Sequence, residues 1–412
     1  MLTRLPIIMA VITPILALAA CSDSRDTRPV TSDRLAEVTD FESYNWQEVT
    51  AGNRWEPRAG LQALELDNKF FLFGGRTPRP PSMPNPIPGD SDIYNDVWAS
   101  ADQGETWEIV LESGGDHWPP RAYFKAVVKD EFLYIIGGQD YDLIELPFCA
   151  GQPPEICPPF VSNSNFFNDV WRSPDGINWE QMTGNAGWEA RAGLSAAVLN
   201  EDIYVLGGSK NDDVVFTGGP PLRIYFNDVW KSSDGVNWEL LTDSAPWEAR
   251  AGGVLVTRGE YLYLLGGENG FLCDPLPDCE LPYFNDVWRS SDGVDWELVT
   301  ESADWSARPG HQCGVIHDSF VCFGGYGYPE NPVDVWISSD GAQWRLLSDA
   351  PWNATLSEQI KYDFDIIVTD PSSLDPAPAI FTFGGDRETF DFNDPENYLR
   401  IDDDIWKFSL PH

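Results

Sequence analysis

The sequence predicts an all-β protein, a six-bladed β-propeller made of four-stranded antiparallel sheets. Three observations lead to this prediction. The 412 residues contain 18 tryptophans, these fall into three classes of six at recurring spacings, and six diglycines recur in register with them. Short β-branched and aromatic runs flank each diglycine and are bounded by polar turns, as is typical of strands. Repeats of this size that bury one another's faces favour a propeller.

Each tryptophan class marks one place in the repeat, whose four strands we call a to d in chain order. Strand c ends in motifs such as Asn-Asp-Val-Trp, at Trp98, Trp171, Trp230, Trp288, Trp336 and Trp406. Strand d carries Trp107, Trp179, Trp238, Trp296, Trp344 and, as the sixth of its kind, Trp46. The third class precedes strand a, at Trp55, Trp118, Trp188, Trp247, Trp305 and Trp352. The diglycines close strand b, at residues 74–75, 137–138, 207–208, 266–267, 324–325 and 384–385.

The two ends of the repeat array are complementary. The chain finishes on a c-type strand around Trp406 and starts with a single d-type strand around Trp46. We therefore expect the N-terminal strand to complete the sixth blade and close the ring.

These motifs resemble kelch repeats: a diglycine ending strand b, an aromatic residue in strand c, a tryptophan in strand d, and Arg-x-Gly-His at residues 308–311 opening strand a. The resemblance covers roughly residues 44–412. It implies the fold shared by the central domain of galactose oxidase and by bacterial N-acetylneuraminate epimerases. A shared fold does not by itself carry a function.

Residues 1–20 read as a secretory signal peptide, with Arg4, an apolar run and small residues before a cysteine. The junction Leu18-Ala19-Ala20-Cys21 resembles the lipobox of bacterial lipoproteins, which implies acylation of Cys21. We interpret residues 21–43 as the acylated cysteine and a flexible tether, and residues 44–412 as the propeller. The expected location is the bacterial cell envelope, at the outer membrane or cell surface, with the lipid anchor as the only membrane contact.

Charge and composition restrict the partners. The chain has 66 acidic and 26 basic residues, a formal net charge of -40, and 42% hydrophobic residues. The apolar fraction argues against disorder. The excess negative charge argues against nucleic acid, which binds through Lys and Arg. We expect a monomer that recognises a protein or a carbohydrate.

The cysteines other than Cys21 lie in three local pairs, and an even number in an exported chain favours disulfides. We expect the disulfides Cys149–Cys157 and Cys273–Cys279. Cys313 and Cys322 flank the a–b turn of blade 5 and would face each other across it, so we expect a third disulfide there. Free buried thiols at the last pair are the alternative.

Interval lengths separate a constant scaffold from variable loops. The third-class tryptophan precedes the diglycine by 19 residues in five blades and by 32 in the sixth. The b–c interval, from the diglycine to the strand-c tryptophan, differs in length between blades. We place the extra residues of blade 6 in its a–b turn, around residues 369–379. Because strands alternate in direction, the b–c loops share one face with the segments that open strand a. Binding residues are expected on this loop face.

Two sets of residues on the loop face are candidates for ligand binding. An arginine opens strand a in five blades, with Thr355 in the sixth place; these arginines either form an anion-binding ring or pair with the aspartates of strand c. They are Arg58, Arg121, Arg191, Arg250 and Arg308. The residues just after the diglycines do not repeat, which favours them for specificity. They are Arg76, Gln139, Ser209, Glu268, Tyr326 and Asp386.

Several chemistries find little support. Four histidines without ligand spacing and the lack of a glycine-rich phosphate loop predict no cofactor and no metal. The Ser-x-Asp-Gly segments are similar to the Asp-box of sialidases, but turn chemistry explains them. Acidic runs such as residues 402–404 and 212–213 are interpreted as solvated surface rather than calcium loops.

Two functions remain. The first is a lipid-anchored, non-catalytic propeller that binds a protein or glycan through the loop face. The second is a sugar mutarotase or epimerase of the sialic acid type, with Glu268 beside Arg250, or His311 beside Arg308, at the channel mouth. A titratable group buried next to an arginine would favour the enzyme.

Overall fold

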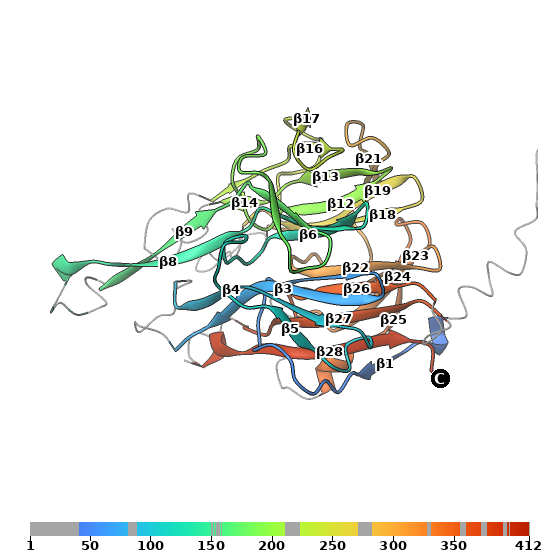
Figure 1. Ribbon diagram of the computed structural model, residues 1–412. Helices are drawn as coiled ribbons and strands as arrows, with labels where there is room; N and C mark the ends of the chain where they lie inside the picture. The colour runs from blue at the N-terminus through green and yellow to red at the C-terminus, as the bar shows by residue number, and fades with distance from the viewer. Residues whose placement is uncertain are drawn as a thin grey trace, which may run out of the picture. The chain divides into compact units, whose positions relative to one another are not determined.

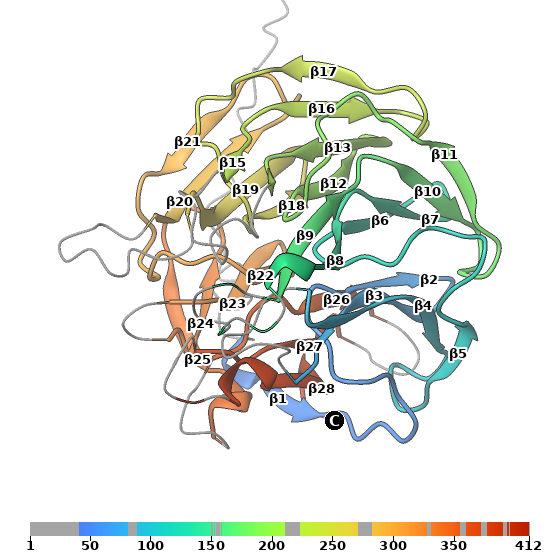
Figure 2. The ribbon, with the colours of Figure 1, turned by 90° about the vertical axis from the view of Figure 1, so that its left-hand side faces the viewer.

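The computed structural model consists of six four-stranded antiparallel sheets arranged in a ring (Figures 1 and 2). It describes residues 41–80, 89–149, 159–210, 223–270, 282–327, 331–354, 360–371, 377–389 and 396–411, together with 151, 153, 157 and 394. The predicted all-β, six-bladed propeller is confirmed. In Figure 2 the viewer looks at the loop face, from which the hairpin of β8 and β9 projects.

In blades 1 to 5, strands a to d follow one another in chain order, whereas blade 6 takes its strand d from the N-terminus. Blade 1 contains β2 (Gln62–Leu66), β3 (Lys69–Pro78), β4 (Ser91–Ser100) and β5 (Glu108–Leu111). Blade 2 contains β6 (Lys125–Lys129), β7 (Phe132–Ile136), β10 (Val170–Ser173) and β11 (Glu180–Thr183). Blade 3 contains β12 (Ser195–Leu199), β13 (Asp202–Leu206), β16 (Val229–Ser232) and β17 (Glu239–Thr242).

The second half of the ring repeats this order. Blade 4 contains β18 (Val254–Arg258), β19 (Tyr261–Glu268), β20 (Tyr283–Ser290) and β21 (Glu297–Thr300). Blade 5 contains β22 (His311–Ile316), β23 (Ser319–Gly324), β24 (Asp334–Ser338) and β25 (Arg345–Asp349). Blade 6 contains β26 (Asp365–Thr369), β27 (Ala379–Asp386), β28 (Ile401–Ser409) and β1 (Asn45–Glu48).

Two short hairpins and several helical turns lie on the loop face or near the ends of the chain. Two-stranded hairpins extend the b–c loops of blades 2 and 3, namely β8 (Gln139–Glu145) with β9 (Phe160–Phe166) and β14 (Ser209–Lys210) with β15 (Ile224–Tyr225). The helical turns are η1 (Phe41–Ser43), η2 (Pro147–Cys149), η4 (Pro351–Ala354) and η5 (Asn397–Leu399). Among the described residues, none of these turns approaches the length and apolarity that a membrane-spanning helix needs.

The ring closes as predicted, because β1 pairs antiparallel with β28 in the register Asn45↔Ser409 to Glu48↔Trp406. The indole of Trp46 packs against Trp352 and Phe408, with ring centroids 5.5 and 5.0 Å away. Phe41, just before β1, is buried in the same core cluster. The first strand is thus held by both backbone pairing and apolar burial.

Tryptophan pairs form the cores of the blades. Each third-class indole is almost completely buried and stands nearly edge-on against the strand-d indole of its own blade, the arrangement that aromatic quadrupoles favour. The pairs are Trp55–Trp107, Trp118–Trp179, Trp188–Trp238, Trp247–Trp296, Trp305–Trp344 and Trp352–Trp46, at 4.5 to 5.9 Å between centroids. Both tryptophan classes are therefore scaffold.

The five arginines pair with the strand-c aspartates of their own blades, the second of the two predicted alternatives. Arg58 is typical: its guanidinium donates to both carboxylate oxygens of Asp96, at 2.7 and 3.1 Å, and to the carbonyl of Gly74. The indole of Trp98 donates to the same carboxylate at 2.9 Å. The other pairs are Arg121–Asp169, Arg191–Asp228, Arg250–Asp286 and Arg308–Asp334. Bidentate, hydrogen-bonded pairs of this kind tolerate burial.

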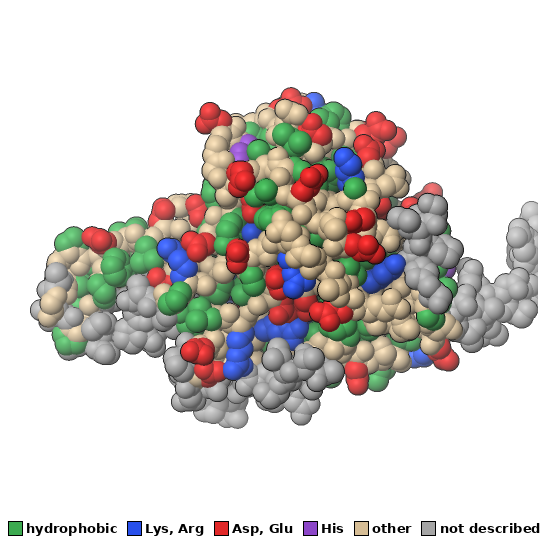
Figure 3. Space-filling view, turned by 60° about the horizontal axis from the view of Figure 1, so that its bottom comes forward, with side chains coloured by type: hydrophobic (Ala, Val, Ile, Leu, Met, Phe, Trp, Pro, Cys, Tyr) green, Lys and Arg blue, Asp and Glu red, His purple; other side chains and the backbone are tan. Residues whose placement is uncertain are grey.

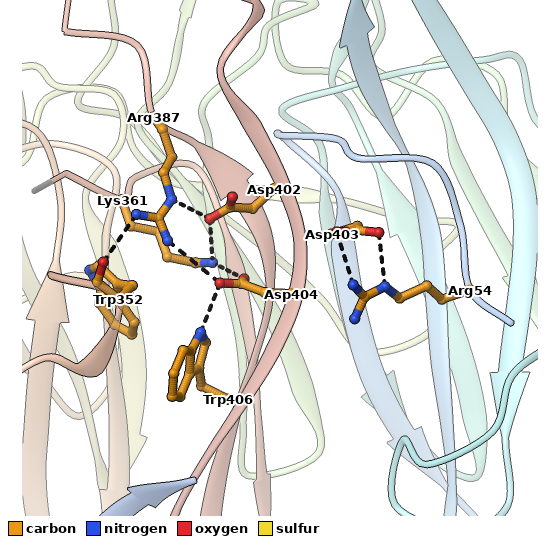
Figure 4. A network of polar contacts seen from close by, with 8 residues as sticks. All are labelled: Arg54, Trp352, Lys361, Arg387, Asp402, Asp403, Asp404 and Trp406. Carbon is orange, nitrogen blue, oxygen red and sulfur yellow. Dashed lines mark hydrogen bonds and ion pairs between the residues drawn. The ribbon is translucent and has the colours of Figure 1, made fainter. Parts of the chain in front are cut away.

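In blade 6, Lys361 takes the place of this arginine (Figure 4). The amide of Gly325 donates to the Lys361 carbonyl. In the same way, the amide of Gly75 in blade 1 donates to the carbonyl of Arg121, the arginine that opens blade 2. The Lys361 ammonium contacts Asp404 and lies 3.2 Å from Asp402. Arg387 contacts Asp402 and adds a second cation to the network.

This network corrects two predictions about blade 6. Thr355 does not hold the sixth place and lies outside the described residues. The extra residues are divided: Lys361 follows Trp352 by nine positions rather than three, and the a–b connection from Thr369 to Ala379 accounts for the rest. The acidic run is also not solvated surface, because its first and last aspartates join the Lys361 network and Asp403 pairs with Arg54 at 2.8 Å. Residues 212–213 lie outside the described part of the chain.

Two of the three predicted disulfides are confirmed. Cys149 and Cys157 are bonded in the loop that joins β8 to β9. Cys313 and Cys322 face each other across β22 and β23 and are bonded as well. Cys273 and Cys279 lie outside the described residues.

Replacing the closing tryptophan tests the ring closure. Trp46→Ala should lower the free energy of unfolding by about 3 kcal/mol, because it removes a large side chain from a packed cluster. Urea denaturation monitored by circular dichroism measures this. Leu346→Ala, at an exposed position of β25, is the control and should change little. Unchanged stability of the Trp46 variant would show that β1 does not hold the ring.

Candidate functional site

Six backbone hydrogen bonds form a closed ring around the central channel at the loop face. Each amide donates to the carbonyl of the equivalent residue in the preceding blade, at 2.8 to 3.1 Å. The members are Gly60, Tyr123, Gly193, Gly252, Gly310 and Asp363. A cavity of about 60 Å³ lies at this ring, large enough for a few waters.

Every member of this backbone ring has a positive φ, between 50° and 66°. Four of the six are glycine, which adopts this conformation freely. Tyr123 and Asp363 are not, and a tyrosine in the left-handed region is strained by about 1–2 kcal/mol. Strain kept at a channel mouth is typical of functional positions.

The two exceptions to glycine lie beside Arg76 and Asp386. The Arg76 Nε donates to the Tyr123 hydroxyl at 2.6 Å, and its Nη2 to an Asp386 carboxylate oxygen at 2.8 Å. Asp386 is buried, and the Tyr362 hydroxyl also contacts its carboxylate. Residues of blades 1, 2 and 6 thus meet at the guanidinium of Arg76, and this contact makes the channel mouth asymmetric. We call Arg76, Tyr123, Asp363, Asp386 and Glu388 the mouth cluster.

The carboxyl groups of the mouth cluster hold protons unusually tightly. Burial and the nearby negative charge of Asp386 raise the pKa of Glu388 to about 8 and that of Asp363 to about 7. Burial raises the pKa of Asp386 itself, an effect that Arg76 opposes. Near neutral pH, Glu388 is therefore mostly protonated and Asp363 about half ionised. Neighbouring groups with separated pKa values are a common arrangement for an acid and a base.

A second arginine–carboxylate pair lies on blades 3 and 4. Arg223 approaches Glu268 to 3.9 Å and donates to the Tyr225 hydroxyl at 3.2 Å. A path of buried tyrosines leads from there toward the mouth cluster: Tyr283 to Tyr326 at 6.1 Å and Tyr326 to Tyr362 at 5.5 Å between centroids. Aromatic and polar side chains thus surround much of the mouth.

The residues predicted after the diglycines all lie at this mouth. Five of them bridge to the opening of a strand a through backbone pairs or bonds, as Arg76 does with Ala59. Arg76 and Asp386 are brought together, whereas Gln139 contacts Tyr141 and Ser209 pairs with Ala192 on blades 2 and 3. Binding by any of them stays a prediction.

Of the two predicted acid–base pairs, Glu268 with Arg250 does not form, whereas His311 does lie beside Arg308. Arg250 is occupied by Asp286, so Glu268 instead faces Arg223. His311 is buried beside Trp305, and burial together with Arg308 lowers its pKa to about 3. A histidine in that environment stays neutral and takes no part in proton transfer near neutral pH.

Sequence reasoning missed Tyr123, Asp363 and Glu388. A signal for the first two was present, because Arg-Ala-Gly or Arg-Pro-Gly opens four blades, whereas Arg-Ala-Tyr and Lys-Tyr-Asp open blades 2 and 6. No repeat marks Glu388. In the described ranges, no group of three or more His, Cys, Asp or Glu side chains is placed to hold a metal ion.

Acidic side chains spread over the molecular face seen in Figure 3, with basic ones between them singly or in small groups. The negative charge of the chain is therefore largely exposed. A negative surface of this kind favours solubility and attracts cationic partners. Because the charge is spread out, it does not mark one binding site.

Comparisons with known proteins support the fold. No family model matches the chain. A stretch of 203 residues, 47% of this chain, is 26% identical to the flagellar outer arm dynein alpha chain of Chlamydomonas reinhardtii, but spans only 4% of that protein. The solved structure of YjhT is similar over 86% of this chain and 96% of that one, with a TM-score of 0.57 and 14% sequence identity. At that identity the similarity concerns the fold alone.

The strained tyrosine provides a test of which ring members are structural. Tyr123→Gly should keep the free energy of unfolding within about 1 kcal/mol of wild type, because relief of backbone strain offsets lost packing. Gly193→Ala should lower it by about 1–2 kcal/mol, because it introduces the same strain. Denaturant titrations compare the two. A larger loss for Tyr123→Gly than for Gly193→Ala would make Tyr123 a scaffold residue.

The raised pKa of Glu388 predicts a pH dependence of stability. An acid that binds its proton more tightly in the folded state contributes fully below its ordinary pKa of 4.5, and the contribution is lost as the pH rises through about 8. Glu388→Gln should therefore lose less stability than wild type between pH 5 and pH 8, measured by urea denaturation at both values. The exposed Glu108→Gln is the control and should follow wild type. Parallel curves for wild type and Glu388→Gln would contradict the buried, protonated carboxyl.

Proposed function

We propose that the mouth cluster binds a cyclic sugar, of the anionic sialic acid type, and catalyses its anomerisation. The observation that carries this proposal is the guanidinium of Arg76 beside two carboxyl groups whose pKa values are raised to about 7 and about 8. The fold similarity to a six-bladed propeller of nearly the same extent is compatible with it.

The reaction needs one base and one acid on opposite sides of the anomeric centre. The ionised Asp363 would take the proton of the anomeric hydroxyl while the ring C–O bond breaks. The protonated Glu388 would give its proton to the released ring oxygen, which leaves an open-chain carbonyl form. After rotation about the adjacent C–C bond, the two transfers run in reverse and restore both residues.

Arg76 is suited to hold the substrate. Its Nε and Nη2 are occupied by Tyr123 and Asp386, whereas its Nη1 makes no hydrogen bond among the described residues. That third nitrogen would donate to a substrate carboxylate, for which guanidinium is the preferred partner. The partly exposed ring of Tyr123 offers a flat surface against the sugar.

Anomer exchange tests the proposal. Purified protein should accelerate the conversion of freshly dissolved α-N-acetylneuraminic acid to the β anomer, followed by proton NMR. Asp363→Asn and Glu388→Gln should each lower the rate by about 100-fold or more, the usual range for general acid–base groups. The rate should be greatest between about pH 7 and pH 8, where base and acid are both in the required form.

Arg76→Met should raise KM more than it lowers kcat, because it removes a binding contact. Arg172→Ala, on the outer part of blade 2, is the matched control and should behave as wild type. No acceleration by a folded wild-type protein, or full activity of both carboxyl variants, would overturn the enzyme assignment.

A second candidate is recognition of a protein or glycan without turnover. The observation that favours it is the β8–β9 hairpin, which projects from the loop face (Figure 1), is joined at its tip by a disulfide, and exposes Phe148 and Ile144 by 76% and 44%. Sugar binding without faster anomerisation, lost in Phe148→Ser, would favour this candidate. In either case, acylation of Cys21, location in the cell envelope and a monomeric state are part of the proposal.

A further inference from the structure

A second, larger cavity lies in the central channel beyond the backbone ring, toward the a–b turns and thus away from the loop face. Its volume is about 400 Å³, within the range of sites for small molecules. The six a-strands line it, from the level of Gln62 and Asp365 to that of Val198 and Val368. We call this cavity the vestibule. It is separate from the mouth cluster, and nothing in the proposed reaction uses it.

Apolar side chains line the sides of the vestibule, together with a comparable area of polar atoms. One or two aliphatic side chains from each strand line it without being fully buried, so they present hydrocarbon surface to whatever fills the space. They include Leu64, Val128, Val198, Val256, Val315, Ile366 and Val368. Water in such a space gains few hydrogen bonds, which favours an apolar occupant.

The inner end of the vestibule is polar, and most of its polar groups are occupied. The Gln62 Oε1 accepts from the Ala126 amide at 3.0 Å, and an Asp365 carboxylate oxygen accepts from the Ala63 amide at 2.7 Å. The Gln312 amide nitrogen donates to the Phe364 carbonyl at 2.8 Å. These side chains join neighbouring a-strands and have a structural role.

Lys125 is the exception at this end. It lines both channel cavities, yet among the described residues it makes neither a hydrogen bond nor an ion pair. The nearest acids, Asp363 above and Asp365 beside it, have pKa values raised by burial to about 7 and about 6. Near neutral pH Asp365 is therefore mostly ionised and Asp363 about half ionised, and both attract the Lys125 ammonium without pairing with it directly among the described residues. A half-buried ammonium that makes no direct contact would be stabilised further by an anion that binds it.

We propose that the vestibule binds a medium-chain aliphatic carboxylate, with the carboxylate on the Lys125 ammonium and the hydrocarbon chain along the apolar walls. The size is consistent with this class, because β6 advances by about 10 Å from Lys125 to Val128. That depth accommodates an extended chain of about eight carbons. The single cation at the inner end selects the charged head, and the walls select the chain.

Isothermal titration calorimetry with sodium octanoate tests the proposal on the purified protein. Octanoate should bind one per chain, whereas 1-octanol and acetate should bind at least about tenfold more weakly, because each lacks one of the two contacts. Lys125→Met should weaken octanoate at least about tenfold and leave 1-octanol unchanged. Val256→Trp, which fills the space, should weaken both.

Three further measurements make the result decisive. Lys231→Met, at a partly exposed lysine outside the channel that pairs with Asp202, should bind octanoate as wild type does. Thermal unfolding should show that Lys125→Met is as stable as wild type, so that lost binding is not lost fold. Glu388→Gln should bind octanoate normally, because this site does not depend on the proposed reaction. Equal binding of octanol and octanoate, undiminished binding by Lys125→Met, or the absence of octanoate binding would overturn the proposal.

Discussion

The closed ring of six backbone hydrogen bonds around the channel is the constraint on which the rest of the structure depends. Each bond joins one blade to the next through a residue in the left-handed region, so the blades meet at the axis with a fixed spacing. Gly310 shows how little space remains, because a Cβ there would lie 2.8 Å from the Asp363 carboxylate. The backbone ring also divides the channel into a loop-face mouth and a vestibule. The two proposed sites lie on different sides of this ring, and the charge of Lys125 acts on Asp363 between them.

The buried arginine–aspartate–tryptophan units hold the outer part of the same junction. Each of these arginines spans strands a, b and c of its blade and is almost fully buried, so it is unavailable to a ligand. Blade 6 replaces this unit with two cations and two aspartates, Lys361 and Arg387 with Asp402 and Asp404 (Figure 4). The departure lies next to Asp386, so the irregular blade is also the one that contributes most to the mouth. The proposed site therefore lies where the scaffold is least repetitive.

Much of the architecture could be predicted because the same residue types recur at similar spacings in six units. Blade number, the closing role of the strand around Trp46 and the pairing of Arg58 with Asp96, one of two alternatives, followed from residues in equivalent positions. The two confirmed disulfides followed from the short spacing of their cysteines in the chain. The site was predicted less well. Arg76 and Asp386 were chosen because they do not repeat, but their contact crosses the junction of blades 1 and 6, more than 300 residues apart in the chain. Glu388 follows strand b of blade 6 without any motif.

The sequence by itself determined the number of blades, their order and the residues that bury their faces. The reason is that every blade needs tryptophans and glycines at the same places, so the requirement is local and recurs along the chain. Only the tertiary structure decided which charges meet. Ring closure brings blade 6 beside blade 1 and places Asp363 and Asp386 near Arg76, which shifts their pKa values through burial and mutual repulsion. The same closure places the charges of Asp363 and Asp365 near Lys125, which among the described residues makes no hydrogen bond or ion pair. Electrostatic environment depends on distance in space, and the spacing of residues along the chain does not contain it.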